Sequence, residues 1–201
     1  QEVLDGKDHP LAQEVRRAGE LAEALTKKRM SEGAIDFDVP EVRVVLGDDG
    51  QPVDIIIKER IPTNRLVEEF MLLANRAVAQ EASKRGRPLI YRIHDVPDGE
   101  RIGALADYVR PFGYTLKHDG GTVKRAALND LLKQVKGKPE APVIEQAAIR
   151  SMSKAVYSPH NIGHYGLGFS HYAHCTSPIR RYPDLIVHHW LLEVETALDG
   201  A

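Results

Sequence analysis

The chain has 201 residues, of which 42% are hydrophobic and 28% are charged, and its formal net charge is −2 at pH 7. This length can hold one sizeable core in one or two domains, and the composition is that of an ordinary globular protein. The small negative charge argues against a protein that coats nucleic acid nonspecifically, although it permits a channel with local positive charge.

The single cysteine, Cys175, excludes an internal disulfide framework and is typical of a reducing cytoplasm, so we expect a cytoplasmic protein. No stretch of the sequence contains the roughly 20 consecutive apolar residues that a membrane helix needs. We therefore expect no membrane partner.

The first half of the chain combines helical and strand patterns. Apolar side chains recur three and four residues apart in the helical stretches, whereas two β-branched stretches flank an Asp-Gly pair that is typical of a hairpin turn. The predicted elements are a helix at 11–29 ended by Gly33, strands at 34–37, 42–46 and 53–57, and a helix at 65–84 capped by Thr63-Asn64 and ended by Gly86.

The second half is predicted to be mainly helical. Its elements are a strand at 89–92, a helix from the cap Asp98 to about 110, an exposed turn at 117–125, helices at 126–136 and 144–156, a glycine-rich strand at 165–170, and a largely buried helix from Asp184. We therefore expect a mixed α/β fold with a curved, mostly antiparallel sheet and helices around it.

The stretch at 171–185 reads HYAHCTSPIRRYPDL and is the most informative part of the sequence. Ser177-Pro178 is typical of a helix start, with Ser as the cap and Pro at the first helical position. The free N–H groups of such a turn suit an anion, and Arg180 and Arg181 could add contacts to a phosphate. Two interpretations stay open on physical grounds: a turn that binds phosphate, or a surface arginine pair before a buried helix.

This stretch resembles the signature of the RNase II/RNase R (RNB) family of exoribonucleases. Further segments agree with that family in the same order, and the resemblance extends from about Pro10 to about Val194. These segments are GAIDF at 33–37 with Pro40-Glu41, VEEFMLLAN at 67–75, YRIH at 91–94, RSMSKA at 150–155 and HYGLG at 164–168. The segments at 91–94 and 150–155 resemble the RNase R branch in particular.

The resemblance implies that residues 1–201 are the C-terminal portion of one RNB catalytic domain, and that the fold is incomplete. Members of the family hold Mg²⁺ with an aspartate cluster upstream of the GAIDF segment, and no such cluster is found here. The nearest similar pattern is Asp36-Phe37-Asp38. We therefore expect Mg²⁺ to serve the full-length enzyme, its aspartate ligands and RNA-binding domains to lie outside this sequence, and the isolated chain to be inactive.

The activity implied by the resemblance is hydrolytic 3′→5′ degradation of single-stranded RNA to 5′-monophosphate nucleotides. Arg180 is expected to contact the scissile phosphate, with Arg181 as the alternative. Phe37 is expected to stack on a base and Glu68 to contact a ribose, although a core phenylalanine and a solvated glutamate are the simpler interpretations. The remaining candidate RNA contacts are Asn75, His174, Ser177 and Tyr182.

Several alternatives remain at this stage. Arg92 or His94 could also reach RNA, although a lone histidine is more often a structural hydrogen-bonding group. The spacing of His171, His174 and Cys175 lacks the paired pattern of closed zinc sites, so we predict no metal site in this chain. The alternative function is a catalytically inactive RNA-binding or scaffold module, and ribosomal or RNA-decay partners would act through domains outside this sequence.

Overall fold

The computed structural model of the chain describes residues 2–35, 37, 41–58, 61–120 and 122–199. Within this part the chain forms six α-helices, one short 3₁₀ helix and four strands. The elements are α1 (Ala12–Ser31), β1 (Glu41–Leu46), β2 (Pro52–Lys58), α2 (Pro62–Lys84), β3 (Tyr91–Ile93), α3 (Gly99–Val109), η1 (Arg110–Phe112), α4 (Arg125–Val135), α5 (Ala141–Ser151), β4 (Val156–Ser158) and α6 (Tyr182–Asp199).

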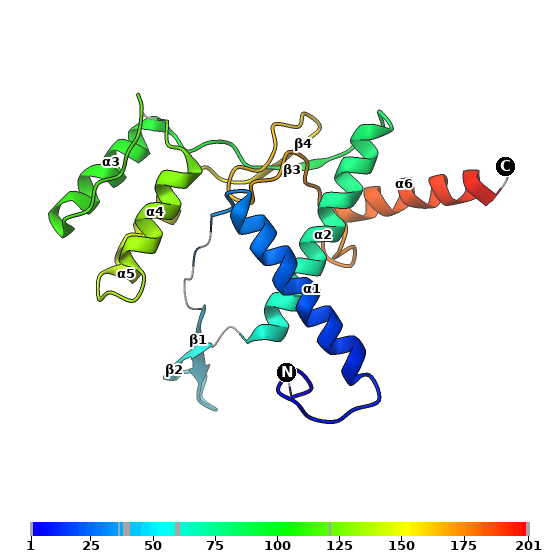
Figure 1. Cartoon of the computed structure of the whole chain (residues 1–201), viewed down its shortest axis with the longest axis horizontal. Helices are drawn as coiled ribbons and strands as arrows, with labels where there is room; N and C mark the ends of the chain where they lie inside the picture. Colours follow the sequence, from blue (N-terminus) through cyan, green and yellow to red (C-terminus); the bar gives the residue numbers. More distant parts are fainter. Residues whose placement is uncertain (1, 36, 38–40, 59–60, 121, 200–201) are drawn as a thin grey trace.

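The helices form two groups on either side of the small β3–β4 sheet (Figure 1). Helices α3, α4 and α5 make up one group, and α2 and α6 make up the other. Helix α1 crosses α2, and the β1–β2 hairpin lies apart from the two groups, toward the start of α2. The segment that carries both arginines of the sequence signature therefore lies in the α2–α6 group, next to the sheet.

The larger hydrophobic core lies among α3, α4 and α5. Ile102, Leu128, Leu131 and Ile144 are at most 1% exposed, because the helical spacing of the apolar residues turns one face of each helix inward. The start of α3 is capped as expected: the Asp98 carboxylate accepts hydrogen bonds from the backbone N–H groups of the two residues Glu100 and Arg101, at 2.9 and 3.3 Å.

A second core joins α2 to β3 and α6. Ala79 and Ala82 of α2 are fully buried and share this core with Tyr91, Val187 and Trp190. The small side chains of α2 let neighbouring elements approach its backbone closely. A smaller cluster of Leu72, Phe169 and Tyr172 extends the packing toward the loop that precedes the signature.

Both sheets are two-stranded and antiparallel. In the hairpin, Val44 pairs with Ile55, and Gly50 adopts a φ of +76° in the predicted turn. In the second sheet, Arg92 of β3 lies opposite Tyr157 of β4. The mixed α/β class and the antiparallel pairing are thus confirmed, but the strands form two separate small sheets instead of one curved sheet.

The structure corrects four of the predicted elements. Residues 34, 35 and 37 are not assigned to a strand, and the glycine-rich segment 165–170 forms turns, with Gly168 at a φ of +73°. The predicted helix 144–156 ends at Ser151, since residues 156–158 leave it to pair with β3. Helix α2 begins at Pro62 without a side-chain cap from Thr63-Asn64, because proline is already suited to the first helical turn.

In the part of the chain that the structure describes, no helix has both the length and the apolar character needed to span a lipid bilayer.

Candidate functional site

Residues 177–181, the arginine turn, connect the second core to α6. The backbone N–H of Arg180 donates to the carbonyl of Ser177 at 3.2 Å and closes a single turn, and α6 begins only at Tyr182. The prediction that a helix begins at Pro178 is therefore wrong. Pro183 has no N–H and would clash inside a helix that started at Pro178, whereas it is tolerated in the first turn of α6.

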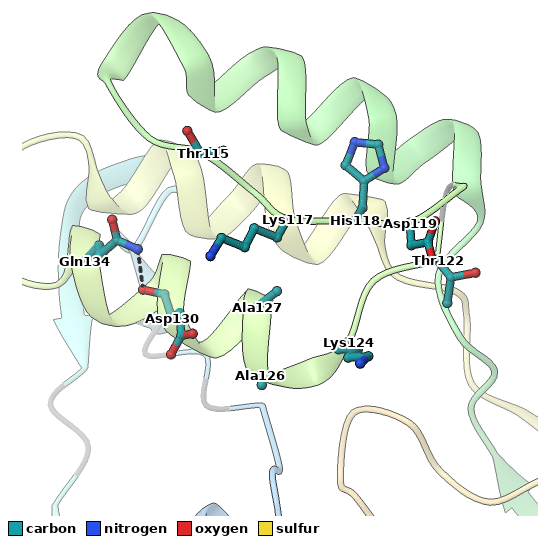
Figure 2. A pocket seen from close by; sticks show the side chains of 10 residues that line it. All are labelled: Thr115, Lys117, His118, Asp119, Thr122, Lys124, Ala126, Ala127, Asp130 and Gln134. Atoms are coloured by element: carbon teal, nitrogen blue, oxygen red, sulfur yellow. Dashed lines mark hydrogen bonds between the residues drawn. The ribbon is translucent and has the colours of Figure 1, made fainter.

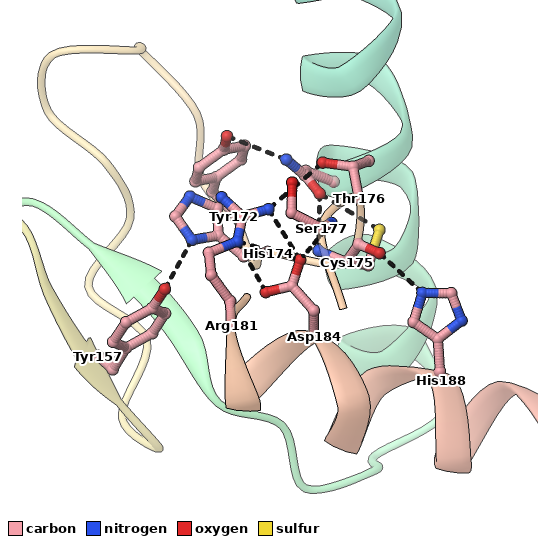
Figure 3. A network of polar contacts seen from close by, with 10 residues as sticks. Tyr157, Tyr172, His174, Cys175, Thr176, Ser177, Arg181, Asp184 and His188 are labelled. Atoms are coloured by element: carbon pink, nitrogen blue, oxygen red, sulfur yellow. Dashed lines mark hydrogen bonds and ion pairs between the residues drawn. The ribbon is translucent and has the colours of Figure 1, made fainter. Parts of the chain in front are cut away.

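A buried carboxylate holds the arginine turn in place (Figure 3). Asp184 is fully buried and accepts a hydrogen bond from the backbone N–H of Ser177 at 2.7 Å. Its carboxylate also accepts from two nitrogens of Arg181, from Nε at 3.0 Å and from Nη2 at 2.7 Å. This bidentate pair, completed by a contact of Arg181 with Thr176 Oγ1 at 3.4 Å, fixes the turn against the start of α6.

The two adjacent arginines consequently have different environments. The Arg181 side chain is 20% exposed and forms an ion pair with Asp184. Arg180, by contrast, is exposed and forms no ion pair with any residue that the structure describes. Its neighbour Tyr182 is 73% exposed. Arg180 is therefore the guanidinium that this turn offers to a ligand, while Arg181 stabilises the turn itself.

Asn75 of α2 forms hydrogen bonds with the segment that precedes the arginine turn. It is 2% exposed, its Nδ2 donates to the Tyr172 hydroxyl at 3.2 Å, and its Oδ1 accepts from the Cys175 N–H at 2.8 Å and from the Cys175 thiol at 3.2 Å. Burial raises the pKa of that thiol to about 11. This geometry favours a positioning role for Asn75 over the direct RNA contact expected from the sequence.

His174 lies beside the arginine turn and is held by a neighbouring strand. Its Nδ1 is 2.8 Å from the Tyr157 hydroxyl, and its ring packs edge-on against Tyr157 and Tyr172. Burial, followed by the nearby positive charges of Arg181 and Arg92, lowers the pKa of His174 to about 4. His174 is therefore neutral at pH 7.

The two consecutive glutamates of α2, Glu68 and Glu69, differ in their burial. Glu69 is 3% exposed and pairs with Arg29 of α1, whose Nε is 3.2 Å from Oε1. Glu68 is half-buried on another face of the helix. The sequence gives no signal for the pair, because Arg29 lies at the end of a basic run, Lys27-Lys28-Arg29, that is typical of a solvated helix terminus.

Phe37 is half-buried and packs against the α3–α5 core. Its neighbours Asp36 and Asp38, the pattern nearest to an aspartate cluster, lie outside the described residues. Part of the Phe37 side chain is buried in this packing and part is exposed. The structure is therefore compatible with a core residue and also with a ring that stacks on a base.

Two of the larger cavities lie in the α3–α5 group, away from the arginine turn. One, of about 860 Å³, is lined by residues of α3 and α5 that include Arg101 and Arg150. The other, of about 760 Å³, lies between the 115–124 loop and α4, with the Lys117 side chain directed into the space (Figure 2). Neither is lined by any of the site residues that the sequence resemblance implies.

Nowhere in the described ranges do three or more histidine, cysteine, aspartate or glutamate side chains gather closely enough to hold a metal ion. The residues present therefore do not fit the magnesium ions that the sequence resemblance implies, and we derive no chemical step through them.

Comparisons with known proteins agree with each other. The model of the RNB domain matches residues 1–197. The chain is 43% identical over 183 residues to Ribonuclease R of Thermotoga maritima and 39% identical over 189 residues to that of Aquifex aeolicus. These matches cover 90% and 94% of this chain, but only 26% and 27% of the two relatives. The chain thus spans about a quarter of their length.

Solved structures give the same result. RNase R of Mycoplasma genitalium in complex with ribose methylated single-stranded RNA superposes with a TM-score of 0.85 at 27% identity, over 92% of this chain and 29% of that chain. Yeast Ssd1, described as a pseudonuclease, superposes with a TM-score of 0.56 at 25% identity, over 66% of this chain and 17% of that one.

Proposed function

The chain belongs to the RNB domain family, and we propose from this premise that it forms the C-terminal portion of the catalytic domain of a hydrolytic 3′→5′ exoribonuclease. The full-length protein would degrade single-stranded RNA to 5′-monophosphate nucleotides. Support comes from the RNB match over residues 1–197 and from relatives named Ribonuclease R. The single observation that carries the proposal for this part of the protein is the exposed guanidinium of Arg180 on a turn fixed by Asp184.

In this proposal, Arg180 contacts the scissile phosphate and stabilises the negative charge that develops there during hydrolysis. Such stabilisation is effective when the donor is held in place before the reaction begins, because little reorganisation is then needed. Arg181 takes the positioning role through Asp184. Phe37 stacks on a base near the 3′ end, and Glu68 accepts a hydrogen bond from a ribose hydroxyl.

The Mg²⁺ that the sequence resemblance implies would serve the full-length protein. Its ligands would come from residues outside the part of the chain described here. The isolated chain is therefore expected to release no mononucleotides when it is supplied with RNA and Mg²⁺.

The decisive experiment is turnover by the full-length protein that contains this chain, measured on a 5′-labelled single-stranded RNA. Arg180→Ala should lower kcat by about 10²- to 10³-fold, the usual effect of removing a donor to a developing oxyanion, while RNA affinity changes only a few-fold. Arg101→Ala on α3 is the matched control and should retain full turnover. Unchanged kcat in Arg180→Ala would remove this residue from the chemistry.

A second candidate function is a catalytically inactive RNA-binding or scaffold module. The observation that favours it is the structural similarity to yeast Ssd1, which is described as a pseudonuclease. The same experiment separates the two functions: wild-type full-length protein that binds RNA but releases no nucleotides in Mg²⁺ would support the scaffold and refute the nuclease.

A further inference from the structure

We propose that Arg92 and Tyr157 form a further binding subsite for single-stranded RNA, next to the arginine turn, in which a base stacks on the ring and the guanidinium attracts the backbone. The inference rests on the proposed function only in taking single-stranded RNA as the ligand. It does not require that the RNA is cleaved.

The two side chains are paired before any ligand arrives. Arg92 of β3 and Tyr157 of β4 are cross-strand partners, and the guanidinium carbon of Arg92 lies 4.8 Å from the centroid of the Tyr157 ring. The backbone N–H of Arg92 donates to the Tyr172 carbonyl at 2.8 Å, which ties β3 to the segment before the arginine turn. A cation–π pair on paired strands has little conformational freedom left to lose on binding.

Tyr157 remains accessible in this arrangement. The residue is 39% exposed although Arg92 lies over the ring, so part of its surface is open to a ligand. By contrast, His94 on the same segment is buried, and both of its ring nitrogens contact the backbone, Nε2 at the Ser153 carbonyl and Nδ1 at the Gly166 N–H. Of the two candidates on this segment, the geometry thus selects Arg92.

A hydrogen bond joins the subsite to His174, which lies beside the arginine turn. The Tyr157 hydroxyl lies 2.8 Å from His174 Nδ1, and Figure 3 shows His174 between Tyr157 and the Arg181 guanidinium. A strand of RNA whose phosphate meets Arg180 would therefore pass close to the Arg92–Tyr157 pair.

The charges around His174 favour an anionic ligand. Burial is the largest cause of the lowered pKa of this histidine, and three guanidinium groups, those of Arg181, Arg92 and Arg180, lower it as well, while Asp184 is the carboxylate that opposes them. Asp184 is already paired with Arg181, so among the residues that the structure describes no carboxylate forms an ion pair with Arg92 or Arg180, and their positive charges can act on a ligand. Positive charge beside an open aromatic ring is the usual combination for single-stranded nucleic acid, since every base can stack and every nucleotide carries a phosphate.

The test is equilibrium binding of a 5′-fluorescent single-stranded oligoribonucleotide to the full-length protein, in EDTA so that turnover does not intervene. Tyr157→Leu and Arg92→Met should each weaken binding by about tenfold, the scale of one lost base stack. Tyr157→Phe keeps the ring and should stay within about twofold of wild type. The matched controls are Tyr108→Leu, at a tyrosine of α3 that is 45% exposed, and Arg101→Met, and neither should weaken binding.

Binding within twofold of wild type for both Tyr157→Leu and Arg92→Met would overturn the subsite, and RNA degradation by the same preparations would leave the proposed nuclease function standing. Conversely, a wild-type protein that releases no nucleotides, but whose RNA affinity still depends on both residues, would support the subsite and refute the nuclease. If Tyr157→Leu lowers the thermal midpoint more than Tyr108→Leu does, then Arg92→Met alone decides: tenfold weaker binding supports the subsite and unchanged binding refutes it.

Discussion

The buried carboxylate of Asp184 allows a quantitative test of how the arginine turn is held. Asp184→Asn keeps the shape of the side chain but removes its charge, so that Arg181 loses its partner while remaining only 20% exposed. Breaking a buried ion pair from one side costs about 3–5 kcal/mol. Because Arg181 can recover part of its hydration at the surface, we expect the lower end, about 3 kcal/mol of unfolding free energy.

The assay is thermal and urea unfolding, followed by circular dichroism, of wild type, Asp184→Asn, Arg181→Met and the double variant. A loss of about 3 kcal/mol corresponds to a fall in Tm of about 6–12 °C for a chain of this size. The double variant should be more stable than the sum of the two single effects predicts, with a coupling of at least about 1 kcal/mol, because one interaction is removed only once.

The chain supplies its own control for this experiment. Asp107 pairs with Arg110 at the same i,i+3 spacing and at nearly the same distance, 2.8 Å against 2.7 Å, but its side chain is 71% exposed where that of Asp184 is fully buried. Asp107→Asn should therefore leave the unfolding midpoint almost unchanged. Equal effects of the two substitutions, or strict additivity in the Asp184–Arg181 cycle, would refute the reasoning.

Two further predictions follow from the contacts around the turn. Asn75→Ala should lower stability by about 2 kcal/mol in denaturant unfolding, since it leaves the buried Cys175 N–H without its acceptor; a loss below about 0.5 kcal/mol would contradict the positioning role. For His164 and His174, burial lowers the pKa from 6.5 to about 3 and about 4, so the unfolded chain binds protons first as the pH falls. Stability should therefore decrease from pH 6.5 toward pH 4 in a series of Tm measurements, and His164→Gln/His174→Gln should flatten that decrease.

Sequence patterns predicted those elements whose signals are local. Gly33 and Gly86 follow the ends of their helices at φ values of +87° and +63°, Asp98 caps α3, and the apolar set of α4 is buried as its spacing indicates. These features depend on residues within one or two turns of each other. They could be predicted because neither a distant partner nor the packing of the core decides them.

Features that depend on residues far apart in the chain could not be predicted from the sequence. β4 exists because residues 156–158 pair with β3, more than sixty residues earlier, and the buried Arg29–Glu69 pair joins two helices that the sequence treats separately. In the candidate site, too, the local sequence pattern predicted part of the arrangement and a tertiary contact decided the rest. The signature located both arginines, but only the carboxylate of Asp184 distinguishes the one that is held from the one that faces solvent.

The buried thiol of Cys175 has a practical consequence. It is the only cysteine of the chain, it lies where α2 meets the segment before the arginine turn, and its pKa is raised to about 11. Alkylating reagents attack the thiolate, so labelling at neutral pH should be slow while this region stays closed. The rate of iodoacetamide modification at this single site would then report, without any engineered label, how often the buried region beside the arginine turn opens.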